Sequence, residues 1–191
     1  MSRSTSLRDH VAAGILDIAA EVLAERGDSA SMVDIAAAAG VARATLYRYF
    51  PNRDALLRAL YEAAFADLDE RISDAQLDAA PIDEAIARMT RAVLAATNKY
   101  RALGLFKKTP GEAQQADHRL TAPLRAVFER GAAEGSFRDD LPVQTLAEVY
   151  FGLLEGTVSR VIQGQLGVEQ ASAAITGIFL NGVLDASGHG R

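Results

Sequence analysis

The sequence predicts an all-α protein, and three of its features support that prediction. Apolar residues recur every three or four positions along most of the chain, which is the spacing of one face of a helix. Glycines, prolines and turn residues divide these segments. No stretch alternates apolar and polar residues over the length of a β-strand. We therefore expect a chain that folds into helices alone.

Nine helices are expected, and local signals mark where several of them begin and end. Gly27 follows the first helix, because glycine readily adopts the left-handed conformation of a helix end. Ser31 and Asn52 are expected to cap the second and fourth helices, Gly40 to end the second, and Pro81 to open the fifth. The expected ranges are 8–26, 32–39, 43–49, 53–76, 82–98, 100–108, 112–135, 142–163 and 168–186.

The composition is typical of a globular protein of the cytoplasm. Of the 191 residues, 49% are hydrophobic and 24% are charged, so the chain can bury a core and is not a disordered segment. The absence of cysteine excludes disulfide bonds, zinc sites with cysteine ligands and a thiol nucleophile. The N-terminus lacks the apolar core of a signal peptide, and no apolar run is long enough to span a bilayer. We expect a cytoplasmic protein without a membrane partner.

The charge is distributed unevenly along the chain. The net charge is −5, but residues 1–58 contain seven arginines and seven acidic residues. A surface that binds nucleic acid would therefore be a local patch near the N-terminus. Arg3 and Arg8 form a loose basic arm before the first expected helix, and this arm either enters a minor groove or stays solvated.

Residues 40–57, GVARATLYRYFPNRDALL, place arginines, a hydroxyl and aromatic rings within a few positions. Two short helices joined by a tight turn, with another helix before them, match a helix-turn-helix unit, whose second helix lies in the major groove. Leu46 and Phe50 would point inward. An arginine can bind guanine through two hydrogen bonds, and a tyrosine can donate to a phosphate. The residues expected to face DNA are Arg43, Ala44, Thr45, Tyr47 and Arg48, with Arg53 binding a phosphate at the start of the next helix.

The segments ILDIAAEVLAERG (15–27) and IAAAAGVARATLYRYFPNRDALL (35–57) resemble the DNA-binding domain of the tetracycline-repressor (TetR) family of bacterial transcriptional regulators. The shared signature, AG-V-x-x-x-T-L-Y-x-Y-F, follows an alanine-rich helix and is long enough to be specific. The remaining two thirds of the chain match the family only in the count and length of their helices. The resemblance implies that the DNA contacts include Ser31, Met32, Tyr47, Tyr49 and Arg53, the last in place of the usual lysine.

This sequence departs from the family pattern at two positions. Ala42 stands where a serine often caps the recognition helix, so that cap is expected to be missing. Arg48 adds a cation beside Tyr47, with a phosphate as its expected partner. Both departures bear on which operator is read. From the residues alone, Tyr49 is either a core aromatic or a contact near the DNA backbone, and Phe50 belongs to the core.

A single helix-turn-helix unit reads too few base pairs to be specific, so we expect a homodimer on a palindromic operator of double-stranded DNA. Apolar residues surround nearly the whole of the expected eighth helix, and the ninth adds a further apolar face. We expect a four-helix contact between two subunits, as in TetR-like dimers, the alternative being an internal core. The expected interface contains Phe151, Gly152, Leu154, Gly156, Val158, Ile162, Ile175, Ile178 and Phe179.

The family resemblance also implies a pocket for a small-molecule effector among the expected fourth to seventh helices. The side chains available there are mostly apolar, which favours a hydrophobic or aromatic ligand. For each residue the plain alternative is a place in the core. The expected lining is Phe65, Ile86, Met89, Thr90, Val93, Tyr100, Leu103, Phe106, His118, Leu120, Leu124, Phe151 and Glu155.

These features predict a ligand-responsive transcriptional repressor without cofactor, metal or catalytic residues. The sequence contains no Walker, GxGxxG, HExxH or GxSxG motif, which disfavours an enzyme. Residues 1–52 are expected to form the helix-turn-helix DNA-binding domain, and residues 53–191 a helical bundle for effector binding and dimerisation. The alternative is a helical ligand-binding or adaptor protein that does not bind DNA. The protein could also be an activator and not a repressor, because the effect on transcription depends on where the operator lies.

Overall fold

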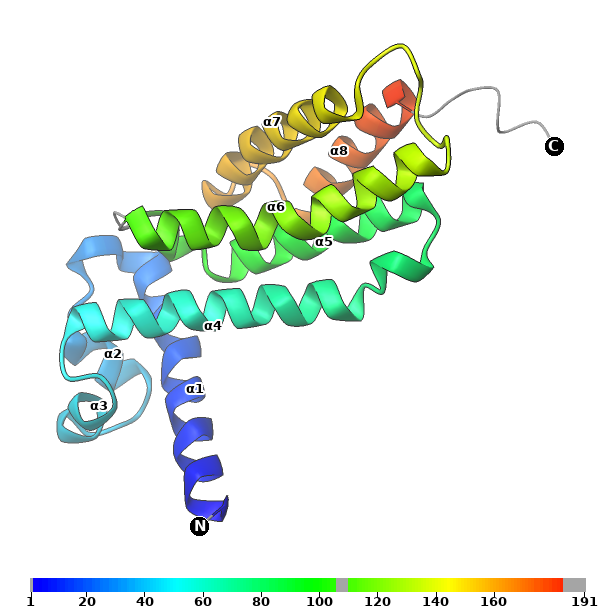
Figure 1. Cartoon of the computed structure of the whole chain (residues 1–191). Helices are drawn as coiled ribbons and strands as arrows, with labels where there is room; N and C mark the ends of the chain where they lie inside the picture. Colours follow the sequence, from blue (N-terminus) through cyan, green and yellow to red (C-terminus); the bar gives the residue numbers. More distant parts are fainter. Residues whose placement is uncertain (1, 106–109, 184–191) are drawn as a thin grey trace. The chain divides into compact units, whose positions relative to one another are not determined.

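The computed structural model describes residues 2–105 and 110–183 (Figure 1). No β-strand occurs in these residues, and the prediction of an all-α protein is confirmed. The α-helices are α1 (Ser2–Arg26), α2 (Met32–Ala38), α3 (Arg43–Tyr49), α4 (Arg53–Asp74), α5 (Ile82–Lys99), α6 (Pro110–Ala133), α7 (Val143–Ile162) and α8 (Val168–Val183). Short 3-10 helices lie between some of them: η1 (Gly27–Ser29), η2 (Leu77–Ala79) and η3 (Arg101–Leu105).

Two expectations about the helices are wrong. Helix α1 begins at Ser2, so Arg8 lies in a helix and not in a loose arm before it. The segment SRSTSLRDH has no apolar stripe, so its helical state gave no periodic signal. The expected helix 100–108 is the 3-10 helix η3, with Gly104 weakening the helix there. The rest of that expected helix, 106–108, and the expected end of the last helix, 184–186, lie outside the described residues.

The chain divides into two compact units. Unit 1 comprises Met1–Ala66 and Lys99–Lys107, and unit 2 comprises Asp67–Asn98 and Lys108–Arg191. The division falls within α4, which therefore contributes residues to both units. The expected separation of functions at residues 52 and 53 stays a prediction.

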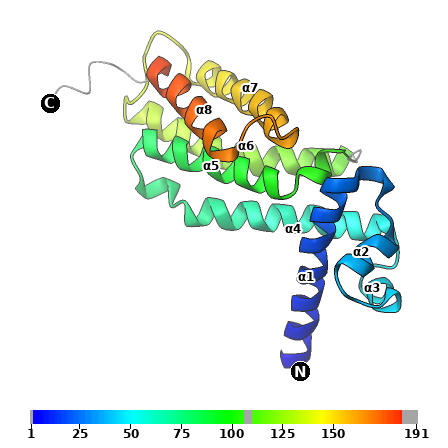
Figure 2. The same ribbon diagram turned by 180° about the vertical axis from the view of Figure 1, so that it is seen from behind.

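Unit 1 is built around α1, which contacts α2, η1 and η3, while α2 contacts α3. Both ribbon views show α2 and α3 side by side (Figures 1 and 2). Residues 99–105 join this unit through a hydrogen bond of 3.1 Å from the Tyr61 hydroxyl to the Leu103 carbonyl. An ion pair of 3.4 Å between Lys99 and Asp17 adds to it. Helix α1 therefore packs against both the α2–α3 pair and this later segment.

Unit 2 has one hydrophobic core, to which α4, η2, α5, α6, α7 and α8 all contribute. Aromatic rings form its centre. Phe128 lies 5.4 Å from Phe137, 5.8 Å from Tyr150 and 5.8 Å from Phe179, measured between ring centroids. Such pairs stabilise a core beyond the apolar area that they bury. Within the described part of the chain, no helix combines the length and the apolar character that crossing a membrane requires.

Candidate nucleic-acid interface

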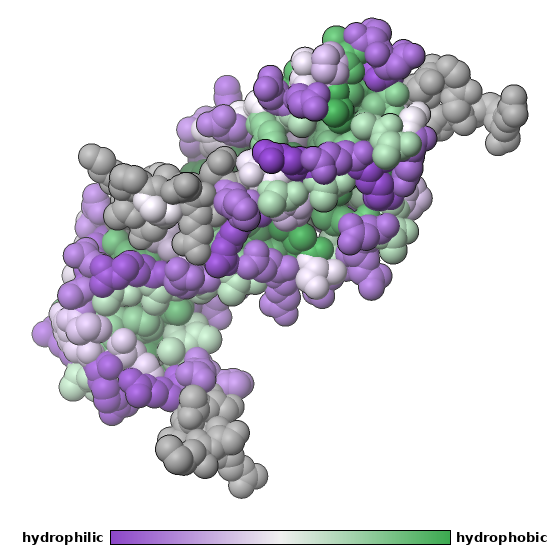
Figure 3. All heavy atoms as spheres, in the orientation of Figure 1, coloured by the Kyte–Doolittle hydropathy of each residue, from purple (hydrophilic) through white to green (hydrophobic). Residues whose placement is uncertain are grey.

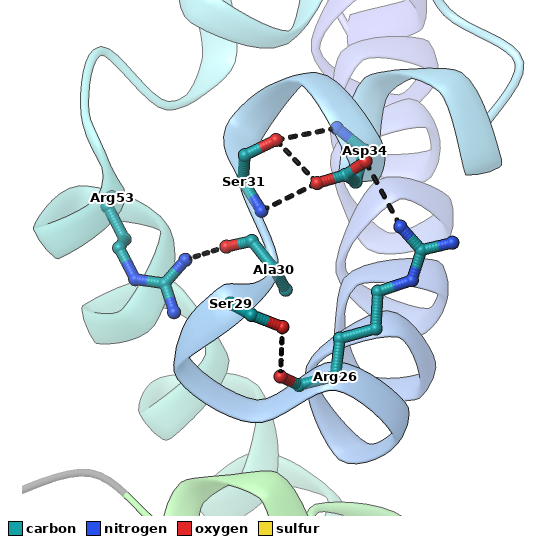
Figure 4. Close-up of polar contacts among 6 residues, drawn as sticks. All are labelled: Arg26, Ser29, Ala30, Ser31, Asp34 and Arg53. Atoms are coloured by element: carbon teal, nitrogen blue, oxygen red, sulfur yellow. Dashed lines mark hydrogen bonds and ion pairs between the residues drawn. The ribbon is translucent and has the colours of Figure 1, made fainter.

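A network of hydrogen bonds holds the segment that leads from α1 into α2 (Figure 4). The Asp34 N–H donates to the Ser31 hydroxyl oxygen at 3.2 Å, and the Ser31 N–H donates to the Asp34 carboxylate at 2.9 Å. Arg26 forms an ion pair with Asp34 at 3.1 Å. The Ser31 hydroxyl, the Ser31 backbone N–H and Arg26 hold the pKa of the Asp34 carboxyl below its usual value. The expected cap at Ser31 is confirmed, and this capping box fixes where α2 starts.

The turn between α2 and α3 depends on Gly40. Its φ of 64° lies in the left-handed region that favours glycine. The Gly40 N–H donates to the Ala37 carbonyl at 3.1 Å, and the Val41 N–H donates to the Ala36 carbonyl at 3.0 Å. These two bonds form a Schellman motif, which ends α2 and turns the chain sharply. The N-cap of α3 is then Ala42, without a side-chain cap, as the sequence predicts.

Helix α3 presents a polar face to solvent. Leu46 is fully buried and anchors the helix, and Phe50, which follows it, is 6% exposed. Tyr47 is 45% exposed, which is unusual for a large aromatic side chain. Of the residues expected to face DNA from α3, one, Thr45, is half-buried. The other four are exposed: Arg43, Ala44, Tyr47 and Arg48. The structure thus brings all five to one short, accessible helix.

Two arginines lie close to the Tyr49 ring. The guanidinium of Arg48 is 5.4 Å from the centre of the Tyr49 ring, and that of Arg8 is 5.8 Å from it. Arg48 therefore lies against Tyr49, and a phosphate as its partner stays a prediction. Because Arg8 belongs to α1, its contact with the half-buried Tyr49 connects α1 to the end of α3.

Two other expected DNA contacts need correction. Met32 is 8% exposed, so its side chain belongs to the core and only its main chain could meet DNA. Arg53 points back into its own unit. Its guanidinium donates a hydrogen bond to the Ala30 carbonyl (Figure 4). It also lies 3.6 Å from the Asp28 carboxylate. The cation at the start of α4 thus has its partners within the chain, and no phosphate is needed to explain it.

The residues expected to line an effector pocket fall into several environments. Ile86, Met89, Thr90, Val93 and Leu124 are buried in unit 2, and Phe151 is half-buried there. Phe65, Tyr100 and Leu103 are buried residues of unit 1. Phe106 lies outside the described residues, and the Leu120 side chain is likewise not described. His118 and Glu155 are exposed, and exposed side chains do not line an enclosed pocket.

Thr90 already has partners in the core of unit 2. Its hydroxyl donates to the Ile86 carbonyl at 2.7 Å and lies 2.8 Å from the Tyr150 hydroxyl. Because the single hydroxyl proton of Thr90 is used, Tyr150 is the donor of the second bond. Burial raises the pKa of Tyr150 to about 12. The expected polar anchor for a ligand is therefore part of an internal hydrogen-bonded pair.

The residues expected at a subunit interface divide into a buried and a surface group. Leu154 (8% exposed), Ile175 (3%) and Phe179 (2%) belong to the core of unit 2, so their expected place in an interface is wrong. Each helix directs one ridge at that core, and these residues lie on it. Phe151, Val158 and Ile162 are half-buried. Gly152, Gly156 and Ile178 are exposed, and Figure 3 shows green apolar side chains among purple hydrophilic ones over α7 and α8.

The family model for bacterial regulatory proteins of the tetR family matches residues 15–60, which span most of α1, all of α2 and α3, and the start of α4. Residues 15–60 belong to the DNA-binding domain of the TetR family. The chain is a DNA-binding transcriptional regulator, as the sequence predicts, and the alternative of a helical adaptor that does not bind DNA is not supported.

Relatives of this chain are also transcriptional regulators. The regulator NfxB of Pseudomonas aeruginosa is 29% identical over 160 residues, covering 80% of this chain and 84% of NfxB. The repressor LfrR of Mycolicibacterium smegmatis is 39% identical over 93 residues, 49% of each chain. The crystal structure of LfrR in complex with proflavine matches with a TM-score of 0.67 at 26% identity, over 94% of this chain and 99% of LfrR. PfmR of Thermus thermophilus shares the fold, with a TM-score of 0.72 at 24% identity over 87% and 97% of the two chains.

Sequence reasoning missed two structural features that bear on these sites. Val149 is 52% exposed and lies on the same stripe of α7 as Gly152 and Gly156, three and seven residues later. The spacing of Val149, Gly152 and Gly156 in the sequence could have shown that Val149 lies on this stripe. The contacts of Arg53 with Ala30 and Asp28 gave no signal in the sequence, because they join residues more than twenty positions apart.

Proposed function

We propose that this TetR family regulator binds a palindromic operator as a homodimer and represses transcription until a small hydrophobic or aromatic effector releases it. The observation that supports DNA reading most strongly is the exposed polar face of α3, which follows a Schellman turn and is anchored by Leu46. The N-terminal turn of α3, Arg43–Thr45, reads base edges, and Tyr47 and Arg48 lie toward the phosphates. The regulator acts in the cytoplasm, where DNA is accessible, and has no catalytic role.

The exposed face of α7 and α8 supports a dimer. Val149 and Ile178 leave 52% and 68% of their surface exposed in the single chain. A Cβ added at Gly152 or Gly156 would meet nothing within 4 Å, so packing inside the chain does not require these glycines. A glycine within a helix costs about 0.5–1 kcal/mol relative to alanine. A second subunit that approaches closely at these positions explains the cost.

The effector class is supported by the apolar residues of unit 2 and by one relative. Among the described residues of this unit, the buried polar side chains are Thr90 and Ser172, and the other buried ones are apolar or aromatic. Such surroundings favour a ligand without strong charge. LfrR, named as a repressor, has been crystallised with proflavine, an aromatic compound. Proflavine is therefore the first effector to test.

A gel shift on DNA that flanks the protein's own gene tests the DNA part of the proposal. We expect a sequence-selective complex that weakens steeply with added salt, and release on adding proflavine or another aromatic ligand. A reporter gene under the same DNA should be silenced by the protein. A protein that binds all duplexes equally would contradict operator recognition, and an activated reporter would contradict repression.

Sedimentation of Gly156→Leu tests the dimer. The new side chain should overpack the contact between subunits and shift the protein toward the monomer. Gly14→Leu is a matched control, because Gly14 is also an exposed helical glycine with open space around it, in α1. If Gly156→Leu sediments as a dimer like the control, α7 is not in the interface.

A further inference from the structure

We propose that Arg53 is a positioning residue that ties the start of α4 to the turn before α2, and that it is not a phosphate contact. This inference rests on the proposed function, because the position that Arg53 fixes is that of the DNA-reading helix. A basic residue at the start of α4 would by default be taken as a backbone contact. The contacts of Arg53 within unit 1 point to a different role.

The first contact is with the main chain. Ala30 is 1% exposed and lies between η1 and the N-cap of α2, in an extended conformation. Its carbonyl precedes α2 and lies outside the helical ladder of that helix, so it needs a partner. The Arg53 Nη1 atom donates to this carbonyl. A buried carbonyl without a donor is costly, so the bond holds Ala30 and the guanidinium together.

The second contact neutralises the charge. The Asp28 carboxylate lies 3.6 Å from the Arg53 Nη2 atom. The Arg53 side chain is 29% exposed, whereas that of Asp28 is 87% exposed. A phosphate that approached the guanidinium from solvent would meet this carboxylate, and like charges repel. Arginine suits the two contacts because its planar fork can reach two acceptors at once, which a lysine ammonium does less well.

The tie reaches the reading helix through a short chain of contacts. The turn that Arg53 holds is also fixed to α1, since the Ser29 hydroxyl donates to the Arg26 carbonyl at 2.7 Å and Arg26 pairs with Asp34 (Figure 4). The turn leads directly into α2, and α2 contacts α3. Arg53 therefore fixes the start of α4 relative to the α2–α3 pair. Loss of the Arg53 contacts should therefore make the position of α3 relative to the base edges less well defined. It should have a smaller effect on the attraction to the phosphates.

The test uses Arg53→Gln, with Arg58→Gln as a control that removes the same charge from an exposed position of α4. Affinity is measured for the operator and for a random duplex over a series of salt concentrations. We expect Arg53→Gln to reduce the ratio of the two affinities about tenfold, the scale of one lost base contact. The slope of log affinity against log salt should stay as in the wild type.

Two results would overturn the assignment. A phosphate contact would weaken both duplexes equally and lower the magnitude of the salt slope by about 0.9. A side chain with a purely structural role would leave both the ratio and the slope unchanged. If Arg53→Gln does not fold, Arg53→Lys distinguishes the two roles, because lysine keeps the positive charge but not the planar guanidinium. A positioning role predicts a lower ratio of operator affinity to random-duplex affinity in Arg53→Lys, whereas a phosphate contact predicts an unchanged ratio.

Amide hydrogen exchange without DNA separates this inference from the proposed function. In Arg53→Gln, the amides of residues 28–35 should exchange faster than in the wild type and in Arg58→Gln, because the turn before α2 has lost its tie. Unchanged exchange of the amides of residues 28–35 would contradict the positioning role of Arg53, whether or not the protein binds an operator. Faster exchange in a protein that recognises no operator would support the tie while contradicting the proposed function.

Discussion

The buried pair formed by Thr90 and Tyr150 gives a prediction that can be worked out from its geometry. Tyr150 is fully buried, and its hydroxyl donates to the Thr90 hydroxyl at 2.8 Å, while Thr90 donates to the Ile86 carbonyl. Tyr150→Phe removes one neutral hydrogen bond and should lower the free energy of unfolding by about 1 kcal/mol. Thr90→Val leaves the buried phenol without an acceptor and should cost more, about 1–3 kcal/mol.

The double variant Tyr150→Phe, Thr90→Val distinguishes a real pair from two independent polar groups. Once both hydroxyls are removed, no buried polar atom lacks a hydrogen-bond partner. The free energy of unfolding of the double variant should therefore fall by about 1 kcal/mol less than the sum of the two single losses. Urea unfolding at one fixed protein concentration measures all four proteins. Additive losses would refute the pairing and would make Thr90 available again as an anchor for an effector.

The same pair predicts how stability depends on pH. Burial raises the pKa of Tyr150 from 10.0 to about 12. Between these values the unfolded state loses the phenol proton while the folded state keeps it, so the free energy of unfolding falls as pH rises through this window. Below the unfolded value this contribution is complete. Comparing unfolding of the wild type and of Tyr150→Phe across the window isolates the effect, and equal slopes would contradict it.

Substitutions at three further positions give predictions, each checked by thermal or urea unfolding. Ala42→Ser should stabilise the protein by about 0.5–1 kcal/mol, because Ala42 is exposed and already extended at an N-cap that lacks a side-chain acceptor; no gain would contradict the missing cap. Gly131→Ala should destabilise it by about 1–3 kcal/mol, since the new Cβ would overlap the Phe137 ring and lie 2.7 Å from its Cζ atom; a neutral result would mean that the ring can move. Tyr49→Leu should cost about 0.5–1 kcal/mol and Tyr49→Phe almost nothing, because the arginines need only a ring face; equal losses would assign the effect to the hydroxyl.

Local signals made much of the fold predictable. The Asn52 side chain accepts from the Ala55 N–H at 2.8 Å, and Ser31 caps α2, so both expected caps are confirmed. Gly40 ends α2 as expected. Each of these features depends on a residue type and on its neighbours in sequence, which is why the sequence was sufficient.

Features that depend on distant residues were not predictable. Ile175 and Ile178 are alike in sequence terms, yet one is 3% and the other 68% exposed. Periodicity identifies the apolar faces of a helix but not which of them faces the chain's own core. The partners of Thr90 and Arg53 are likewise set by tertiary packing, since Tyr150 is 60 residues from Thr90 and Ala30 is 23 from Arg53.

The central claim is that the N-terminal turn of α3 reads the operator, and Arg43→Ala tests it most directly. Affinities of Arg43→Ala and of the control Arg58→Ala are measured on a panel of operators changed at each base pair in turn. We expect Arg43→Ala to lose about 1–3 kcal/mol of discrimination at one position of each half-site, with the control's ranking unchanged. An unaltered ranking in Arg43→Ala would contradict the claim.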